Sequence, residues 1–181
     1  MITRAFGETI PGLKIDGVPA PYPVLNERAV RAGAGIMLLL GIIAFIPAFF
    51  LREFLLLQII VTYLLFEFGF RIFINPKYTP ISILANWIVR RQRPEFVGAI
   101  QKKFAWGIGF ALALIMFILV NIFGIIHPIN LVICGICLTV MYFETSFGIC
   151  IGCKMYNFLI KKGILNPKIK EACPGGSCSL K

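Results

Sequence analysis

The chain has 181 residues, of which 59% are hydrophobic and only 14% charged, and its formal net charge is +10. A water-soluble domain is about half apolar and roughly a quarter charged, so this composition excludes an ordinary soluble enzyme. The basic residues flank apolar runs and form no continuous stripe, which excludes a nucleic-acid-binding surface. The composition therefore predicts an integral membrane protein whose main partner is the lipid bilayer.

The first thirty residues predict an N-terminal segment, residues 1–30, that stays outside the membrane. This segment contains four prolines, Pro11, Pro19, Pro21 and Pro23, and it has no apolar core of the signal-peptide type. We therefore expect no cleaved export signal.

Four apolar segments follow, each with about the 20 residues that a transmembrane helix needs. The predicted spans are residues 32–51, 54–74, 104–126 and 130–153. Arg52 and Glu53 form a very short turn between the first two spans, and His127-Pro128 ends the third. The predicted fold is an all-α membrane protein with four transmembrane helices arranged as two hairpins, in a domain of residues 31–160.

The loop between the second and third spans contains a further helical pattern. Ile81, Leu84, Trp87 and Ile88 recur at helical spacing, which predicts a short amphipathic helix lying in the membrane interface. Trp87 and Trp106 are then expected at headgroup depth. An irregular loop is the alternative.

The distribution of Lys and Arg predicts the orientation. Of the 18 basic residues, only Arg52 falls outside three regions: the residues before the first span, the long loop with the end of span two, and the residues after span four. The positive-inside rule then places both termini and the long loop in the cytoplasm. We therefore expect a multi-pass protein of the cytoplasmic (inner) membrane.

The two predicted hairpins resemble each other. Span two ends in Phe66-Glu67-Phe68-Gly69, and span four ends in a segment from Phe143-Glu144 to Phe147-Gly148. A short segment with an arginine, residues 26–28 and 93–95, precedes the first span of each hairpin. This favours an internal duplication of the same orientation, although chance is an alternative because Phe and Gly are abundant.

Two acids, Glu67 and Glu144, lie inside apolar helices, where a carboxylate is costly without a partner or a wet cavity. Glu67 has Arg71 at i+4, which predicts an ion pair. Glu144 has no basic residue within a turn, so either a residue of another helix pairs with it, with Arg71 the leading candidate, or it is protonated. Both a structural and a functional role stay open for Glu144.

Cys150 and Cys153 form a C-x-x-C at the predicted end of span four. Residues i and i+3 share one helix face, so both sulfurs could meet one partner. They are the candidate thiol site, with Glu144 assisting proton movement. Their position near a helix C-terminus argues against thiolate character, and Lys154 offsets this only partly. Cys134 and Cys137, within span four, are interpreted as small packing residues.

The C-terminal tail, residues 161–181, adds Cys173 and Cys178 around a Pro-Gly-Gly turn. With Cys150 and Cys153 they make four thiols whose spacing loosely approaches that of a structural zinc site. Zinc is thus the only cofactor expected, and only in this alternative; free thiols on the tail are the other interpretation. His127, the only histidine, is interpreted as an interfacial residue.

The segment Phe147–Tyr156 resembles the ending of an uncharacterised bacterial family of small four-helix integral membrane proteins, a domain of unknown function that ends in Phe-Gly-x-Cys-x-Gly-Cys. The resemblance covers roughly residues 24–160. It implies two helical hairpins joined by a basic cytoplasmic loop, and an association with thioredoxin-like or rhodanese-like proteins. The residues that match are Glu67, Arg71, Tyr78, Pro80, Lys102, Lys103, Phe104, Ala105, Ile108, Gly109, Glu144, Phe147, Gly148, Cys150, Gly152, Cys153 and Tyr156.

Three functions remain open. The first is handling of thiols or sulfur at the cytoplasmic face through Cys150 and Cys153. The second is a non-catalytic accessory subunit, in a homo-oligomer or a larger membrane complex, whose small residues such as Gly107 and Ala111 pack against partner helices. The third is metal binding by the four thiols. The chain has no serine triad, phosphate loop or zinc-protease motif, so the sequence does not identify an enzyme.

Overall fold

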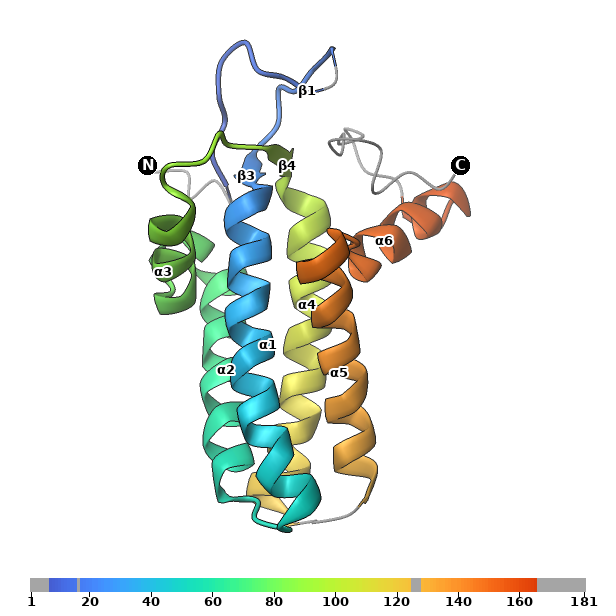
Figure 1. Cartoon of the computed structure of the whole chain (residues 1–181). Helices are drawn as coiled ribbons and strands as arrows, with labels where there is room; N and C mark the ends of the chain where they lie inside the picture. The colour runs from blue at the N-terminus through green and yellow to red at the C-terminus, as the bar shows by residue number, and fades with distance from the viewer. Residues whose placement is uncertain (1–6, 16, 125–127, 166–181) are drawn as a thin grey trace.

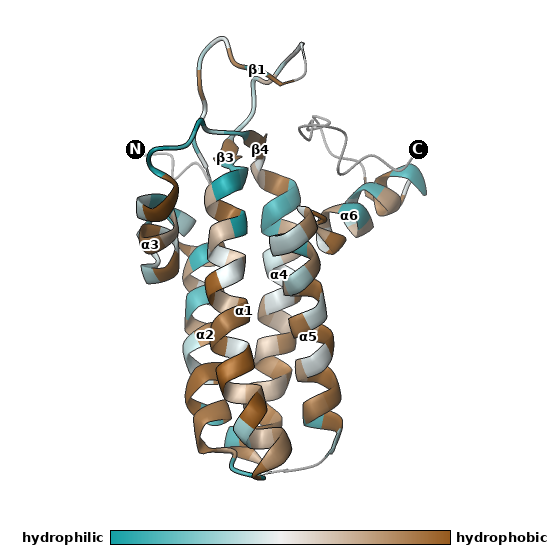
Figure 2. Cartoon of the chain, viewed as in Figure 1, coloured by the Kyte–Doolittle hydropathy of each residue, from teal (hydrophilic) through white to brown (hydrophobic). Residues whose placement is uncertain are grey.

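Four long helices run side by side in the computed structural model, which describes residues 7–15, 17–124 and 128–165 (Figure 1). They are α1 (Glu27–Phe50), α2 (Leu55–Phe73), α4 (Ala99–Phe117) and α5 (Pro128–Phe147), and a π-helical stretch, η2 (Ile118–Ile122), extends α4. In the described part of the chain, these four are long and apolar enough to cross a membrane. Figure 2 shows hydrophobic residues along most of their length. The prediction of a multi-pass helical membrane protein is confirmed.

The helix ends differ from the predicted spans. α1 and α4 begin at Glu27 and Ala99, each five residues before the predicted span, so both helices include charged residues that the sequence placed in loops. α5 ends at Phe147, six residues before the predicted end of span four. The short turn at Arg52 and Glu53 lies between α1 and α2, as predicted.

Two short helices lie at the same end of the bundle. α6 (Ile151–Lys161) follows α5, and α3 (Pro80–Val89) follows the 3-10 turn η1 (Pro76–Tyr78). The helix predicted near residues 80–91 is confirmed. Ile81, Ala85 and Val89 are buried against α1, whereas three of the four residues of the predicted apolar stripe, Leu84, Trp87 and Ile88, are not covered by the protein. Trp106 is buried beneath the Arg71 guanidinium, so its ring does not face outward from the bundle as that of Trp87 does.

Two small antiparallel strand pairs complete the described fold. β1 (Lys14–Ile15) pairs with β2 (Val18–Pro19), and β3 (Val24–Asn26) pairs with β4 (Phe96–Gly98). Because β3 leads directly into α1 and β4 into α4, this pairing fixes the starts of two long helices beside each other. We call this end of the bundle the strand end, and it also carries α3 and α6 (Figure 1).

The order of elements occurs twice, as β3-α1-α2-α3 and as β4-α4-α5-α6. The packing repeats as well: α1 contacts α5 and α3, while α4 contacts α2 and α6. Leu25 and Val97 face each other at the centre of the strand pair. This arrangement supports the predicted duplication, with two parallel repeats related by an axis along the membrane normal.

The packing does not divide into two separate hairpins. α2 packs more extensively on α4 than on α1, and α1 packs more extensively on α5 than on α2. The apolar core near Arg52 combines residues of both halves, including Ala44, Leu57 and Val120. The predicted arrangement as two hairpins is therefore not confirmed, because the halves interlock in one bundle.

Candidate functional site

The end of α5 determines where the C-x-x-C lies. Gly148 has a φ of +67°, the left-handed region that favours glycine. The N–H groups of Gly148 and Ile149 donate to the carbonyls of Glu144 and Phe143, at 3.1 and 3.2 Å, and this ends the helix. An added Cβ on Gly148 would also lie 3.2 Å from the Arg31 guanidinium, which donates to the Thr145 carbonyl. The predicted continuation of span four to Cys153 is therefore wrong.

Cys150 and Cys153 instead occupy the first turn of α6. Cys150 is the N-cap residue, with extended backbone, and its Sγ accepts a hydrogen bond from the Cys153 N–H at 3.3 Å. The Cys153 thiol also donates to Cys150 Sγ, with the two sulfurs 2.6 Å apart. Both residues are free cysteines, and both are buried, at 4% and 0% exposure. The C-x-x-C pair is thus brought together as one buried dithiol.

This location reverses the electrostatic argument from the sequence. The pair lies at a helix N-terminus, where the helix dipole stabilises a thiolate, and not at a C-terminus, where it would oppose one. The hydrogen bond from Cys153 lowers the pKa of Cys150, the Lys102 ammonium lowers it further, and burial acts in the opposite direction. Donation of that hydrogen bond, together with burial, raises the pKa of Cys153. Cys150 is therefore the thiol of the pair that loses its proton more readily, with Cys153 as the hydrogen-bond donor.

A buried lysine links the dithiol to the acids of the bundle. Lys102, near the start of α4, is 1% exposed, and its Nζ lies 2.9 Å from a carboxylate oxygen of Glu27 and 2.9 Å from one of Glu144. The expected pairing of Glu144 with Arg71 is wrong. Arg71 donates through Nε and Nη2 to Glu67, at 3.0 and 2.9 Å, as the i+4 spacing predicts. Each buried acid thus has a basic partner, from α4 for Glu144 and from its own helix for Glu67.

The first turn of α6 is pressed directly onto α4. A Cβ built on Gly152 would lie 2.6 Å from the Ala105 Cβ and 2.7 Å from its Cα, so no larger residue fits at this position without movement. One turn later, the ring of Tyr156 packs on Phe104 at 5.3 Å between centroids. Glycine at position 152 therefore allows α6 to close over both sulfurs.

The other half of the molecule has two hydroxyl residues at the positions equivalent to the cysteines. Thr79 is the N-cap residue of α3, and its Oγ1 donates to Ser82 Oγ at 2.8 Å. Thr79 and Ser82 thus correspond to Cys150 and Cys153 in the duplicated fold. Thr79 makes no side-chain cap hydrogen bond, whereas Cys150 accepts one from the Cys153 N–H, so the two halves share the positions of the pair but not the capping interaction.

The remaining candidate residues are not part of this site. Cys134 and Cys137 lie within α5, partly buried, as free thiols. Cys173, Cys178 and His127 lie outside the described residues, and so the four-thiol zinc site stays a prediction. Within the described ranges, no group of three His, Cys, Asp or Glu side chains is close enough to hold a metal ion.

Sequence reasoning missed Glu27, Arg31 and Lys102 as site residues. All three lie in the first turns of α1 or α4, which the hydropathy pattern assigned to loops or lead-ins. The only signal for them was indirect: Glu144 needed a basic partner from another helix. Lys102 was among the residues that match the family pattern, but this match indicated no role for it.

The proton distribution within the dithiol predicts a pH profile. We expect alkylation of Cys150 by iodoacetamide to have its inflection below the ordinary cysteine pKa of about 8.5, since its thiolate persists to lower pH. Cys153→Ala should move the inflection upward, because it removes the hydrogen bond to the thiolate. Peptide mass spectrometry across a pH series measures this, and Cys134 serves as an internal comparison. An inflection that does not move in Cys153→Ala would contradict the assignment.

Comparison with known proteins gives one match. A family model described as "Domain of unknown function (DUF4395)" matches residues 25–161, which include every residue of the dithiol site and its ion pairs. No curated protein matches the chain, and no solved structure matches it.

Proposed function

Because the chain belongs to this family of unknown function, we propose its function from its own geometry: Cys150 and Cys153 exchange a disulfide with a partner protein at the cytoplasmic face of the membrane. The observation that carries the proposal is the hydrogen-bonded dithiol in the first turn of α6, beside the buried ammonium of Lys102. This placement gives the pair a nucleophile and a second, resolving sulfur.

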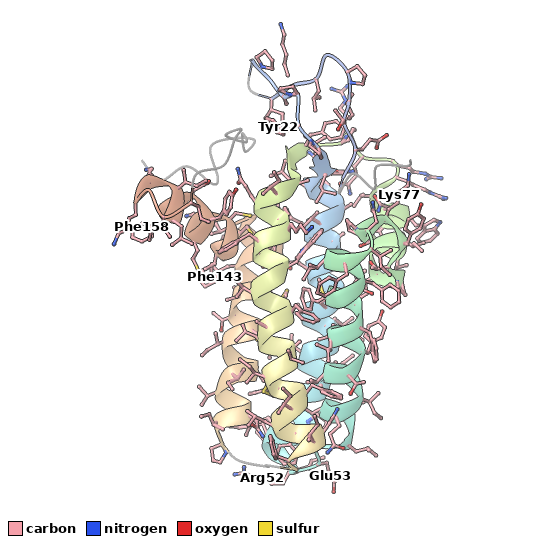
Figure 3. All side chains as sticks on the ribbon, turned by 180° about the vertical axis from the view of Figure 1, so that it is seen from behind. Tyr22, Arg52, Glu53, Lys77, Phe143 and Phe158 are labelled. Atoms are coloured by element: carbon pink, nitrogen blue, oxygen red, sulfur yellow. The ribbon has the colours of Figure 1, made fainter. Side chains whose placement is uncertain are left out.

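The charge distribution supports a cytoplasmic position for the dithiol. Most basic residues of the described chain lie in the strands, near the starts of α1 and α4, or in and around α3 and α6, at the strand end, whereas Arg52 lies between α1 and α2. Figure 3 labels Lys77 and Arg52 toward these two opposite ends. Under the positive-inside rule the strand end, with α6, faces the cytoplasm. A cytoplasmic thioredoxin-like protein is then the class of partner that we propose.

The proposed exchange has two steps and balances in electrons and protons. The Cys150 thiolate attacks one sulfur of the partner's disulfide, which forms a mixed disulfide and releases one partner thiolate. The Cys153 thiol passes its proton to that thiolate, and Cys153 Sγ then attacks Cys150 Sγ, which releases the second partner thiolate to take a proton from water. Two electrons pass from this dithiol to the partner, and the reverse direction uses the same steps.

The charged residues around the pair have positioning roles in this proposal. The Lys102 ammonium stabilises the Cys150 thiolate, and Glu27 and Glu144 hold that ammonium in place through ion pairs of 2.9 Å. Glu144 therefore orients the lysine. Since both sulfurs are buried, the partner gains access only when the first turn of α6 moves away from Ala105.

Thr79 and Ser82, at the equivalent positions in the other half of the molecule, suggest the variant that tests the proposal. The double substitution Cys150→Thr with Cys153→Ser places the residues of the Thr79–Ser82 pair in α6. Because threonine is a favourable N-cap residue, we expect α6 to form and the protein to keep its helix content and its size in detergent. Exchange with an oxidised thioredoxin-like protein should be abolished. The loss of the partner's disulfide measures this exchange. The matched control, Cys134→Ser with Cys137→Ser, should exchange at the normal rate. Undiminished exchange in the first variant would refute the proposal.

A further inference from the structure

α6 presents two different faces. One face lies on α4 and contains Gly152, Cys153 and Tyr156, all buried. On the other face Met155 and Phe158 are 48% and 45% exposed. Figure 3 shows Phe158 on the part of α6 that extends away from the four long helices. The outer face of α6, Met155 and Phe158, is thus apolar and uncovered by the described chain.

Lysines surround this outer face. Lys154, Lys161 and Lys162 lie along or just after the helix, Lys162 Nζ is 4.7 Å from the centre of the Phe158 ring, and α6 contains no acidic residue. Apolar side chains flanked by lysines on one short helix are typical of helices that lie in a membrane interface. The charge sign selects anionic headgroups.

The depth of α6 fits this location. α5 is a membrane-spanning helix that ends at Phe147, and α6 begins four residues later and runs sideways from the bundle (Figure 1). It therefore starts where the chain leaves the hydrocarbon layer. Beyond Tyr156 no residue of α6 is fully buried, in contrast to α3, whose Ile81, Ala85 and Val89 are buried along its full length.

We propose that the outer face of α6 binds the anionic lipid surface around the strand end, and that this binding holds the first turn of α6 closed over Cys150 and Cys153. Met155 and Phe158 would enter the interface, and Lys161 and Lys162 would meet lipid phosphates. The proposal goes beyond disulfide exchange and adds regulation to it, since the lipid then controls access to the dithiol. The partner is the bilayer itself.

The test measures access to Cys150 without any partner protein. The purified full-length protein is placed in vesicles of phosphatidylcholine alone or of phosphatidylcholine with equal phosphatidylglycerol, and alkylation of Cys150 is followed by peptide mass spectrometry. We expect alkylation to be about tenfold slower with phosphatidylglycerol, because the anionic surface attracts the two lysines at the end of α6 and holds the helix closed. Lys161→Gln with Lys162→Gln should abolish the difference. The matched control, Arg90→Gln with Arg91→Gln beyond α3, should retain it.

Equal rates in the two lipids for the unaltered protein would overturn the proposal, as would a lipid difference that persists in the lysine variant. A second measurement does not depend on thiol chemistry. In Phe158→Trp, we expect the added tryptophan fluorescence to be quenched by brominated lipids in anionic vesicles, and absence of quenching would also overturn the proposal. Since neither measurement involves disulfide exchange, failure of exchange with a partner would leave both results interpretable.

Discussion

Replacing Lys102 by methionine is expected to lower the free energy of unfolding by about 3–5 kcal/mol, the cost of removing one partner from a buried ion pair. Lys102 is 1% exposed, and without its ammonium the buried carboxylates of Glu27 and Glu144 would lose their ion-pair partner. Denaturation of the protein in mixed micelles with increasing SDS measures the change. The loss should be smaller at acidic pH, where the two carboxyl groups become neutral.

A triple variant separates charge from packing. Lys102→Met combined with Glu27→Gln and Glu144→Gln removes all three charges, and we expect it to recover most of the lost stability, because neutral groups of similar shape replace the ion pairs. A single Lys102→Met variant as stable as the unaltered protein would contradict the central place of Lys102. The single variant should also alkylate more slowly at Cys150, because the ammonium no longer lowers the pKa of that thiol.

Replacing Gly152 by alanine is expected to expose the dithiol. The new Cβ would lie 2.6 Å from the Ala105 Cβ and 2.7 Å from the Ala105 Cα, and the second of these atoms is backbone that has no room to yield. α6 must therefore move away from α4, at a cost of about 1–3 kcal/mol typical of overpacking. We expect the alkylation rate of Cys150 to rise by about 5-fold to 150-fold, since each 1.4 kcal/mol corresponds to a factor of about ten in the population of the open state.

Gly107→Ala is the matched control for that variant. Gly107 also lies in a helix of the same bundle, but a Cβ there would meet nothing within 4 Å. This control should leave the alkylation rate unchanged and slightly increase stability, because alanine favours helix over glycine. An unchanged alkylation rate in Gly152→Ala would show that the Gly152–Ala105 contact does not close the site.

The four spans could be predicted from the sequence because hydropathy is a local property of each segment. The helix starts could not be predicted in this way, because the ion pair between Glu27 and Lys102 joins two helices that are far apart in the sequence. Two charged residues near the ends of apolar runs resemble loop residues until the strand pair of Leu25 and Val97 brings α1 and α4 together. The partner of Glu144 also depends on a tertiary contact, because Lys102 lies on another helix and 42 residues away in the sequence.

The break between α5 and α6 had a local signal that the hydropathy pattern obscured. Gly148 follows directly after the last apolar residues of α5, as the terminating glycine of a helix commonly does. The predicted span instead continued through Ile149 and Ile151, since both are apolar. That single error placed the cysteines at a helix C-terminus, and the chemistry inferred for them had the wrong electrostatic sign.

The central claim is that Cys150 and Cys153 act as one redox-active dithiol. The most direct test is to map the state of all six cysteines by mass spectrometry in native membranes, with and without added reductant. The account predicts that a Cys150–Cys153 disulfide is present in part of the population and disappears with reductant, while Cys134 and Cys137 remain thiols throughout. Cysteines at 150 and 153 that remain reduced thiols in every sample, even after exposure to an oxidised thioredoxin-like protein, would contradict it.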